Sequence, residues 1–215
     1  QFESLKKIYV ADPVAPDNAR KFTQQIRQRL DEQLRVDAGD IVFEAACGEE
    51  EMRRAVADSH MIVTVTPARV PVIKKEWIKP GTHLSFIGSD MSGKEEIEPE
   101  IFEKAVIYCD DKEHCMEVGE MEIPLKKGLI TEKDISGEIG NLILGRSAGR
   151  TGEDQITIYD ATGMALLDIA AAKAALEQSP ELLPVLKNAG FVDAGGIGFV
   201  VIFEGMAHTI HTGEV

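Results

Sequence analysis

Residues 61–67 read Met-Ile-Val-Thr-Val-Thr-Pro, and residues 87–96 read Ile-Gly-Ser-Asp-Met-Ser-Gly-Lys-Glu-Glu. Each stretch begins in or directly after an apolar run of strand length and continues into a polar loop. In open α/β sheets, ligands bind at the carboxyl ends of parallel strands, where loops and helix N-termini gather. The two stretches therefore predict neighbouring buried strands with a ligand site at their carboxyl ends.

The rest of the chain alternates short apolar runs with amphipathic segments. Strands are predicted near residues 6–11, 41–45, 61–65, 83–87, 105–109 and 156–159. Such alternation is typical of βαβ units and a parallel sheet. The fold class expected is α/β, a Rossmann-like, mainly parallel sheet with flanking helices and a helical C-terminal tail.

Helices are predicted between these strands and after them. The expected ranges are residues 16–34, 49–57, 98–104, 112–119, 131–134, 135–144 and 164–177. We place a Rossmann-like domain over residues 1–163 and a helical tail that packs on it over residues 164–215. The apolar run at residues 199–203 favours a strand by local propensity and a helix by its glycine-rich start; we prefer the helix.

Charge and cysteine content exclude several classes of function. The chain of 215 residues carries a formal net charge of −14, which disfavours nucleic acid and anionic membranes as partners because both require a basic face. Its apolar runs are shorter than the ~20 residues of a membrane span. The three cysteines lack metal-ligand spacing and fit reduced thiols, so the expected location is cytoplasmic.

The motifs carry a family resemblance. A strand ending in Thr66-Pro67, a link that contains Trp77, and the pattern Gly-x-Asp-x-x-Gly-Lys-x-Glu from Gly88 resemble the ornithine cyclodeaminase/mu-crystallin family. Residues 149–163 resemble the Gly-Arg-Thr and Asp-x-Thr-Gly segments of the same family. The resemblance implies an NAD(P)-dependent enzyme that dehydrogenates amino acids or acts on cyclic imines.

Two features of that family have no counterpart ahead of residue 6. One is the first βα unit with its Gly-x-Gly-x-x-Gly turn, whose backbone N–H groups bind the cofactor pyrophosphate. The other is the N-terminal domain, which in the family holds the substrate carboxylate and forms the dimer. The sequence therefore predicts a Rossmann-like domain that is incomplete at its N-terminus.

Residues 172–206 carry a different resemblance. Pro-Glu-Leu-Leu-Pro-Val-Leu-Lys at residues 180–187 and Asp-Ala-Gly-Gly at residues 193–196 are similar to the closing helices of the dihydroxyacetone-kinase-type helical domain. This composition suggests a fusion or an engineered chimera, joined near residues 170–175. We expect the tail to be helical and to cover the sheet where the missing βα unit would lie.

Asp90 is the candidate catalytic residue. Imine reduction requires an acid or base beside the carbon that exchanges hydride. A carboxylate on a loop between Gly88 and Gly93 can reach a ligand while the backbone stays close to it. The family resemblance implies that Asp90 transfers the proton, whereas an aspartate in such a turn otherwise caps the turn.

Six residues at the carboxyl ends of other predicted strands are candidate cofactor ligands. Small hydroxyl residues at the end of a strand let a flat ring lie against the backbone and offer a hydrogen bond. By resemblance to the family, the ligands on the nicotinamide side are Thr64, Thr66, Pro67, Gly88, Thr162 and Gly163. Threonine also favours strands without any ligand.

Asp12 is a further candidate, at the end of the first predicted strand. An acid near that point commonly binds the ribose hydroxyls of NAD, whereas NADP requires a basic residue. Pro13 follows directly, so Asp12 can equally be a turn residue. The choice between NAD and NADP stays open from sequence.

Two hypotheses follow from different classes of protein. The first is a module derived from an NAD(P)-dependent oxidoreductase or cyclodeaminase, weak or inactive alone, with a nucleotide cofactor as partner and a homodimer as a candidate assembly. The second is a non-enzymatic binding or scaffold protein that keeps the Rossmann sheet. A change in NADH fluorescence or melting temperature on adding cofactor would separate them.

Overall fold

The computed structural model describes residues 5–34 and 37–182. The chain divides into two compact units, Gln1–Thr162 and Gly163–Val215. From residue 165 the described part of the second unit is a helix, α6 (Ala165–Leu182), which confirms all but the first residue of the helix predicted at residues 164–177. The interpretation of the chain beyond residue 182, including residues 199–203, lies outside the described residues.

The first unit opens with a two-stranded parallel sheet. It pairs β1 (Lys7–Ala11) with β2 (Val42–Ala46). The helix α1 (Pro16–Leu34) connects these strands and contacts both. The next helix, α2 (Glu49–Asp58), has three acidic residues in its first turn, where the helix dipole favours negative charge.

The main sheet has five strands in the order β3-β5-β9-β7-β8, and every neighbouring pair is parallel. Its strands are β3 (Met61–Thr64), β5 (His83–Phe86), β9 (Thr157–Asp160), β7 (Val106–Cys109) and β8 (Ile135–Glu138). A small separate sheet pairs β4 (Arg69–Ile73) with β6 (Glu95–Ile97). All six predicted strands are confirmed within a residue or two of their predicted ends.

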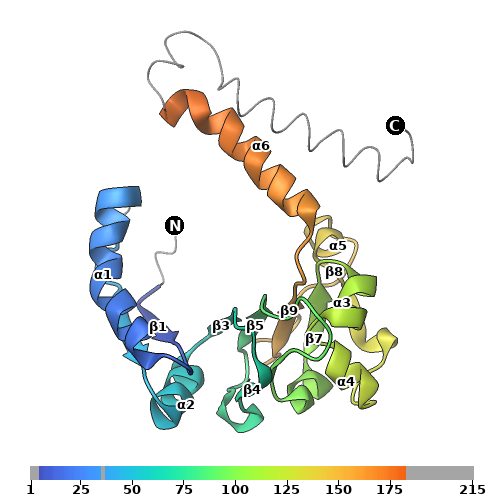
Figure 1. Ribbon diagram of the computed structural model, residues 1–215. Coiled ribbons are helices and arrows are strands. Elements are labelled where there is room, and N and C mark those ends of the chain that lie inside the picture. The colour runs from blue at the N-terminus through green and yellow to red at the C-terminus, as the bar shows by residue number, and fades with distance from the viewer. Residues whose placement is uncertain (1–4, 35–36, 183–215) are drawn as a thin grey trace. The chain divides into compact units, whose positions relative to one another are not determined.

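Short helices occupy the connections of the main sheet (Figure 1). They are η1 (Lys75–Trp77), η2 (Pro99–Lys104), α3 (Lys112–Val118), α4 (Glu122–Lys126), η3 (Glu132–Asp134) and α5 (Ile139–Ile143). The predicted helices at residues 98–104 and 131–134 are 3-10 turns. No helix within residues 5–34 and 37–182 is both long and apolar enough to cross a lipid bilayer.

The prediction of a helix over residues 135–144 is wrong in its first half. Residues Ile135–Glu138 form the edge strand β8, and only Ile139–Ile143 is helical. Gly137 has a φ of +143°, which an α-helix does not allow, and a Cβ there would lie 2.8 Å from the Ser147 hydroxyl oxygen. Pairing with β7 therefore overrides the weak local pattern.

The core lies against the central strands β5, β7 and β9. Leu84, Phe86, Ile107 and Ile158 come from these strands and are fully buried, and Phe102 from η2 packs its ring near that of Phe86. Burying each such side chain stabilises the fold by roughly 1.5–3 kcal/mol. This central core fixes the sheet whose carboxyl ends carry the candidate site.

Candidate functional site

One buried carboxylate joins the ends of β3 and β5. Glu96 is completely buried and accepts the hydroxyl hydrogen of Thr64 at 2.5 Å. It also accepts the backbone N–H of Thr66 at 2.6 Å and that of Gly88 at 3.3 Å. These predicted cofactor ligands therefore converge on one side chain at the carboxyl edge of the sheet.

Gly88 lies where the two loops approach most closely. A Cβ at this position would lie 2.4 Å from the carbonyl oxygen of Thr66 and 2.6 Å from the carboxyl carbon of Glu96. Both neighbours are fixed, one as backbone and the other as a buried, hydrogen-bonded side chain. Only glycine allows this approach, so Gly88 has a structural requirement that is independent of any ligand.

Asp90 lies two residues further along and is exposed. Its carboxylate is paired with the ammonium of Lys94, which also donates to the carbonyl of Gly88 at 3.2 Å. The hydrogen bond from Lys94 lowers the pKa of Asp90. The loop that carries Asp90 is fixed at Gly93, whose backbone N–H donates to the carboxylate of Glu122 at 2.8 Å.

A second buried carboxylate, Glu120, supports the first. It accepts the backbone N–H groups of Glu96 at 2.7 Å and Ile97 at 2.9 Å, and the hydroxyl of Ser89 at 2.5 Å. Burial raises the pKa of Glu120 to about 7. At neutral pH the side chain therefore exchanges between a carboxylate and a carboxylic acid that can donate to Ser89.

Asp160, at the end of β9, completes this chain of buried acids. Its two carboxylate oxygens accept the backbone N–H groups of Glu120 at 3.1 Å and Met121 at 2.9 Å. Burial raises the pKa of Asp160 to about 8. Buried hydrogen bonds thus connect the carboxyl ends of β9, β5 and β3 through three acidic side chains, those of Asp160, Glu120 and Glu96.

Thr162 follows β9 and lies beside the loop after β7. Its hydroxyl contacts the imidazole Nδ1 of His114 at 2.9 Å and donates to Asp110 at 3.5 Å. The next residue, Gly163, has a φ of +90° and begins the second unit of the chain. The hydroxyl of Thr162 is therefore at the same carboxyl edge as Thr66, since β3, β5, β9 and β7 are parallel neighbours.

The sequence left two roles open for Asp12, binding a ribose or stabilising a turn. In the structure its side chain stabilises the turn before α1. One of its oxygens accepts the backbone N–H groups of Val14 at 3.1 Å and Ala15 at 2.8 Å, and the other accepts the Asn18 amide at 2.9 Å. These hydrogen bonds, that of Ala15 foremost, lower the pKa of Asp12. Because a carboxylate oxygen can accept two hydrogen bonds, the second oxygen keeps one acceptor site.

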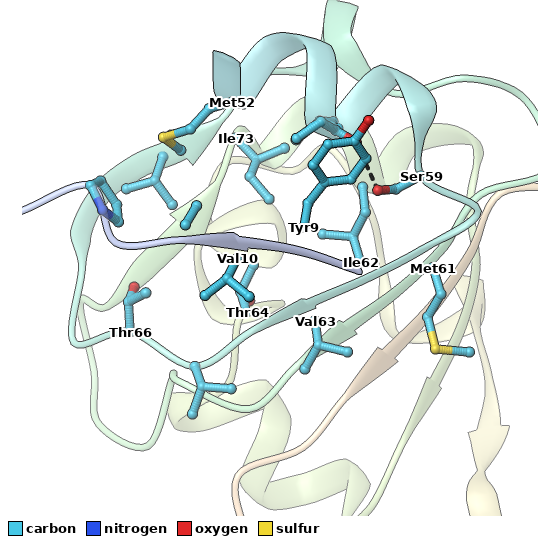
Figure 2. A pocket seen from close by; sticks show the side chains of 16 residues that line it. Tyr9, Val10, Met52, Ser59, Met61, Ile62, Val63, Thr64, Thr66 and Ile73 are labelled. Atoms are coloured by element: carbon cyan, nitrogen blue, oxygen red, sulfur yellow. Dashed lines mark hydrogen bonds between the residues drawn. The ribbon is translucent and has the colours of Figure 1, made fainter. Parts of the chain in front are cut away.

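A cleft of about 330 Å³ lies between β1 and β3 (Figure 2). It is lined by residues 9–11 and Pro13 on one side, by residues 61–66 on the other, and by apolar side chains from α2 and β4. Thr64 and Thr66 belong to this lining, whereas Pro67 is exposed beyond it. The predicted threonines therefore lie at one end of an apolar cleft.

Sequence reasoning named Asp90 and the threonines but gave no role to Glu96 or Glu120. Glu96 closes the quoted Gly-x-Asp-x-x-Gly-Lys-x-Glu pattern, so its spacing from Gly88 was a usable signal. Glu120 had no such signal, because fully buried glutamates are rare and their burial cannot be read from local sequence. Among the described residues, no group of three or more His, Cys, Asp or Glu side chains could hold a metal ion.

Comparison with known proteins gives a consistent result. Residues 4–181 match the family model described as the ornithine cyclodeaminase/mu-crystallin family. An alanine dehydrogenase from Archaeoglobus fulgidus is 43% identical over 119 residues, which are 55% of this chain and 37% of that protein. An iminosuccinate reductase from Paracoccus denitrificans is 35% identical over 127 residues, 59% of this chain and 39% of that protein.

Two solved structures extend the comparison. An archaeal alanine dehydrogenase dimer with bound NAD superposes with a TM-score of 0.67 at 35% identity, covering 79% of this chain and 48% of that one. The Thermococcus litoralis Delta(1)-pyrroline-2-carboxylate reductase, in complex with NADH and L-proline, superposes with a TM-score of 0.71 at 28% identity, covering 87% and 52%. The chain thus spans about half the length of these structures.

Proposed function

Because the chain belongs to the ornithine cyclodeaminase/mu-crystallin family, we propose that it is the NAD(P)-binding part of an oxidoreductase or cyclodeaminase that acts on amino acids or cyclic imines. The observation that carries the proposal is the convergence of Thr64, Thr66 and Gly88 on the buried carboxylate of Glu96. This convergence stiffens the carboxyl ends of two adjacent parallel strands, where such sheets bind nucleotides.

The residues present fit one half of a dinucleotide. The close approach of Gly88 to the Thr66 carbonyl leaves no side chain between the two loops, so a flat ring can lie against the backbone there. The other half needs backbone N–H donors for a pyrophosphate, and no strand in this chain is followed by Gly-x-Gly-x-x-Gly. We expect the nicotinamide side to be formed and the pyrophosphate side to be weak.

The cofactor, when bound, supplies hydride transfer, and the chain supplies proton transfer and positioning. We assign the proton transfer to Asp90. The pairing with Lys94 keeps its pKa low, so Asp90 enters the reaction as a carboxylate that can accept a proton. For donation in the reverse direction, the substrate must draw Lys94 away from Asp90.

The acceptor site left on Asp12 favours NAD over NADP in this proposal. A carboxylate near this position accepts ribose hydroxyls and repels a 2′-phosphate. Asp12 already holds the turn before α1, and the pKa lowered by those hydrogen bonds keeps it charged. Its second oxygen is the atom we expect to contact a ribose.

We propose that the chain by itself turns over little or no substrate. Catalysis requires the cofactor, the substrate and Asp90 to be held together, and the rate falls by many orders of magnitude when the reactants are not positioned. The chain spans 48% of the archaeal alanine dehydrogenase, and the family resemblance implies that the groups that hold the substrate carboxylate belong to a further domain. Dimerisation, known for that relative, stays a prediction that sedimentation can test.

The experiment combines binding and turnover on the same preparations. When the chain is mixed with NADH, the fluorescence of NADH and the melting temperature of the chain should both change. When alanine, ornithine, lysine or a cyclic imine is then added as substrate, absorbance at the nicotinamide band should stay constant, because there is no turnover. Asp90→Asn should leave NADH binding within a few-fold, as should Asp31→Asn on the exposed face of α1.

Two outcomes would change the proposal. If neither fluorescence nor melting temperature responds to NADH or NADPH, the chain is a binding or scaffold protein that retains only the sheet. If turnover is sustained and disappears in Asp90→Asn but not in Asp31→Asn, the chain is a complete enzyme by itself.

A further inference from the structure

The loop that carries Asp90 is buried at its two ends and exposed between them. Ser89 is 1% exposed and Lys94 is 8% exposed, whereas residues 90–93 lie at the surface. The exposed part ends in a turn, in which the N–H of Lys94 donates to the carbonyl of Met91 at 3.3 Å. Asp90 directly precedes this turn, so the conformation of the turn decides where its carboxylate lies.

Gly93 is the third residue of the turn and has a φ of +79°. Glycine adopts a positive φ at this place in a turn without strain. The central residues of the turn are exposed, so burial of apolar surface contributes little to its stability. Hydrogen bonds from outside the loop are therefore needed to fix its conformation.

Glu122 supplies those hydrogen bonds. It is the first residue of α4, and its side chain is 1% exposed. One carboxylate oxygen accepts the N–H of Gly93 at 2.8 Å, and the other accepts the hydroxyl of Ser92. The second oxygen also accepts from the ammonium of Lys126, one turn further along the helix. A single buried carboxylate thus holds both central residues of the turn.

The carboxylate of Glu122 is ionised at neutral pH. Burial by itself raises its pKa, but the hydrogen bonds from Lys126, Ser92 and Gly93 together lower the pKa below the ordinary value. Hydrogen bonds to an ionised acceptor are about twice as strong as those between neutral groups. The turn is therefore held by strong bonds.

Glu120 holds the loop on the other side of Asp90. Its carboxyl group accepts the hydroxyl of Ser89 at 2.5 Å, and its own N–H donates to the buried carboxylate of Asp160 at 3.1 Å. Glu120 and Glu122 are thus two acids of one short segment that contact the loop before and after Asp90.

The ion pair of Asp90 depends on this attachment. Lys94 is fixed by its burial and by its hydrogen bond to the carbonyl of Gly88 at 3.2 Å. The side chain of Asp90 is 57% exposed and reaches the Lys94 ammonium across the turn of residues 91–94. If the turn opens, Asp90 leaves Lys94 while Lys94 stays in place.

We propose that Glu122 is a positioning residue for Asp90, because its hydrogen bonds to Ser92 and Gly93 fix the turn that keeps the Asp90 carboxylate beside Lys94. The inference rests on the proposed function in one respect, the assignment of proton transfer to Asp90. The contacts themselves are independent of any cofactor. Glu122 acts on Asp90 through the turn and takes no proton from a substrate.

Glu122 is a better position for a test than Glu120. Glu120 also accepts the N–H groups of Glu96 and Ile97, so its removal would disturb the small sheet as well as the loop. The hydrogen bonds of Glu122 described above go to the turn and to Lys126. A substitution at Glu122 therefore acts mainly on the turn.

The sign of the change in the pKa of Asp90 separates positioning from simple electrostatics. Removing the negative charge of Glu122 favours the ionised form of Asp90 and by itself lowers its pKa. Loss of the pairing with Lys94 raises that pKa, because the hydrogen bond from Lys94 is the main cause that lowers it. Glu122→Gln removes the charge but keeps an acceptor for Gly93 and a donor for Ser92, whereas Glu122→Ala removes all three.

The test measures the pKa of Asp90 in the full chain by carbon-13 NMR of the aspartate side chains, with Asp90→Asn to assign the resonance. We expect Glu122→Ala to raise this pKa and Glu122→Gln to leave it unchanged or lower. Amide hydrogen exchange of Gly93 should become about tenfold faster or more in Glu122→Ala and change less in Glu122→Gln.

Asp134→Ala is the matched structural control. The Asp134 carboxylate also holds a turn, accepting the N–H of Thr131 at 2.7 Å and its hydroxyl at 2.8 Å, but this turn lies at the amino end of β8. The variant should lose stability and leave the pKa of Asp90 unchanged. Should Glu122→Ala fail to fold, Ser92→Ala removes one hydrogen bond to Glu122 at an exposed position and should raise the pKa of Asp90 by a smaller amount.

Two results would overturn the proposal. One is an unchanged or lower pKa of Asp90 in Glu122→Ala or, where that variant is unfolded, in Ser92→Ala. The other is an equal rise in Glu122→Ala and Asp134→Ala.

NADH fluorescence on the same preparations tests the proposed function separately. If Asp90 responds to Glu122→Ala and NADH does not bind to the wild type, the positioning stands and the proposed function fails. If NADH binds and Asp90 does not respond, the positioning fails and the proposed function stands.

Discussion

The buried carboxylate of Glu96 accepts the hydroxyl hydrogen of Thr64 at 2.5 Å. Thr64 ends β3, whereas Glu96 lies in the middle of β6. A contact between residues 32 positions apart thus fixes the end of a strand in the main sheet to the small second sheet. The loops that would face a ligand are held by this contact before any ligand arrives.

Glu96→Gln should lower the free energy of unfolding by about 1–3 kcal/mol, because an amide NH₂ would face a donor that the carboxylate now satisfies. The measurement is urea denaturation followed by circular dichroism. Glu117→Gln, an exposed glutamate on α3, is the charge-matched control and should change stability little. If the two variants are equally stable, the hydrogen bonds of Glu96 do not stabilise the end of β3.

Gly88→Ala should destabilise the chain by about 1–3 kcal/mol or more, since the added methyl group would lie 2.4 Å from the Thr66 carbonyl oxygen. Gly140→Ala is the matched control, with no heavy atom within 4 Å of the added carbon. Alanine also suits the helix α5 better than glycine. Thermal melts that fall equally for both variants would contradict the close approach at Gly88.

Stability should depend on the protonation of Glu120. Its pKa is raised from 4.5 to about 7, so the folded chain binds a proton that the unfolded chain releases between these values. Stability from this group is full below about pH 4.5 and is lost as the pH rises through about 7. The loss at pH 8 is about 3 kcal/mol at 1.36 kcal/mol per pKa unit.

Glu120→Gln isolates that dependence. A glutamine can accept from the N–H groups of Glu96 and Ile97 and donate to Ser89, so it mimics the protonated acid. The variant should gain stability relative to the wild type between pH 5 and pH 8, as measured by urea denaturation at each pH. A wild-type and a variant curve that run parallel would show that Glu120 does not titrate in this range.

Lys94→Met should raise the pKa of Asp90, because the hydrogen bond from Lys94 is the main cause that lowers it. Carbon-13 NMR of the aspartate side chains measures the shift directly. Lys133→Met, an exposed lysine on η3, removes the same charge and should leave Asp90 unchanged. If Asp90 titrates in the same way in both variants, Lys94 does not lower the pKa of Asp90.

The main sheet could be predicted because each central strand is a compact apolar run, such as residues 83–87 and 105–109, between polar segments. Two of the strands that escaped prediction contain residues that strands disfavour. β8 contains Ser136 and Gly137, and β4 contains Pro71. Their pairing depends on neighbours distant in sequence, which local periodicity does not report.

The residues of the candidate site also fall into those that the sequence could predict and those that it could not. Asp90 and Thr66 lie in motifs with fixed spacing, so sequence could name them. The role of Glu120 in holding their loops could not be predicted, because this residue looks like an ordinary surface carboxylate until the fold buries it. Asp160, in contrast, lies in the Asp-x-Thr-Gly segment that the family resemblance had already singled out. Asp12 shows the opposite case: its three hydrogen bonds explain its position without a ligand.

The most direct test of the central claim, that the carboxyl edge of the main sheet is the cofactor site, is a titration of the nitrogen-15-labelled chain with NADH followed by two-dimensional NMR. Amide resonances of Thr66, Gly88, Asp90 and Thr162 should shift together with one saturation curve, while those at the amino ends of the same strands, such as His60 and Thr82, stay in place. Shifts confined to the amino ends, or none at saturating NADH, would contradict it.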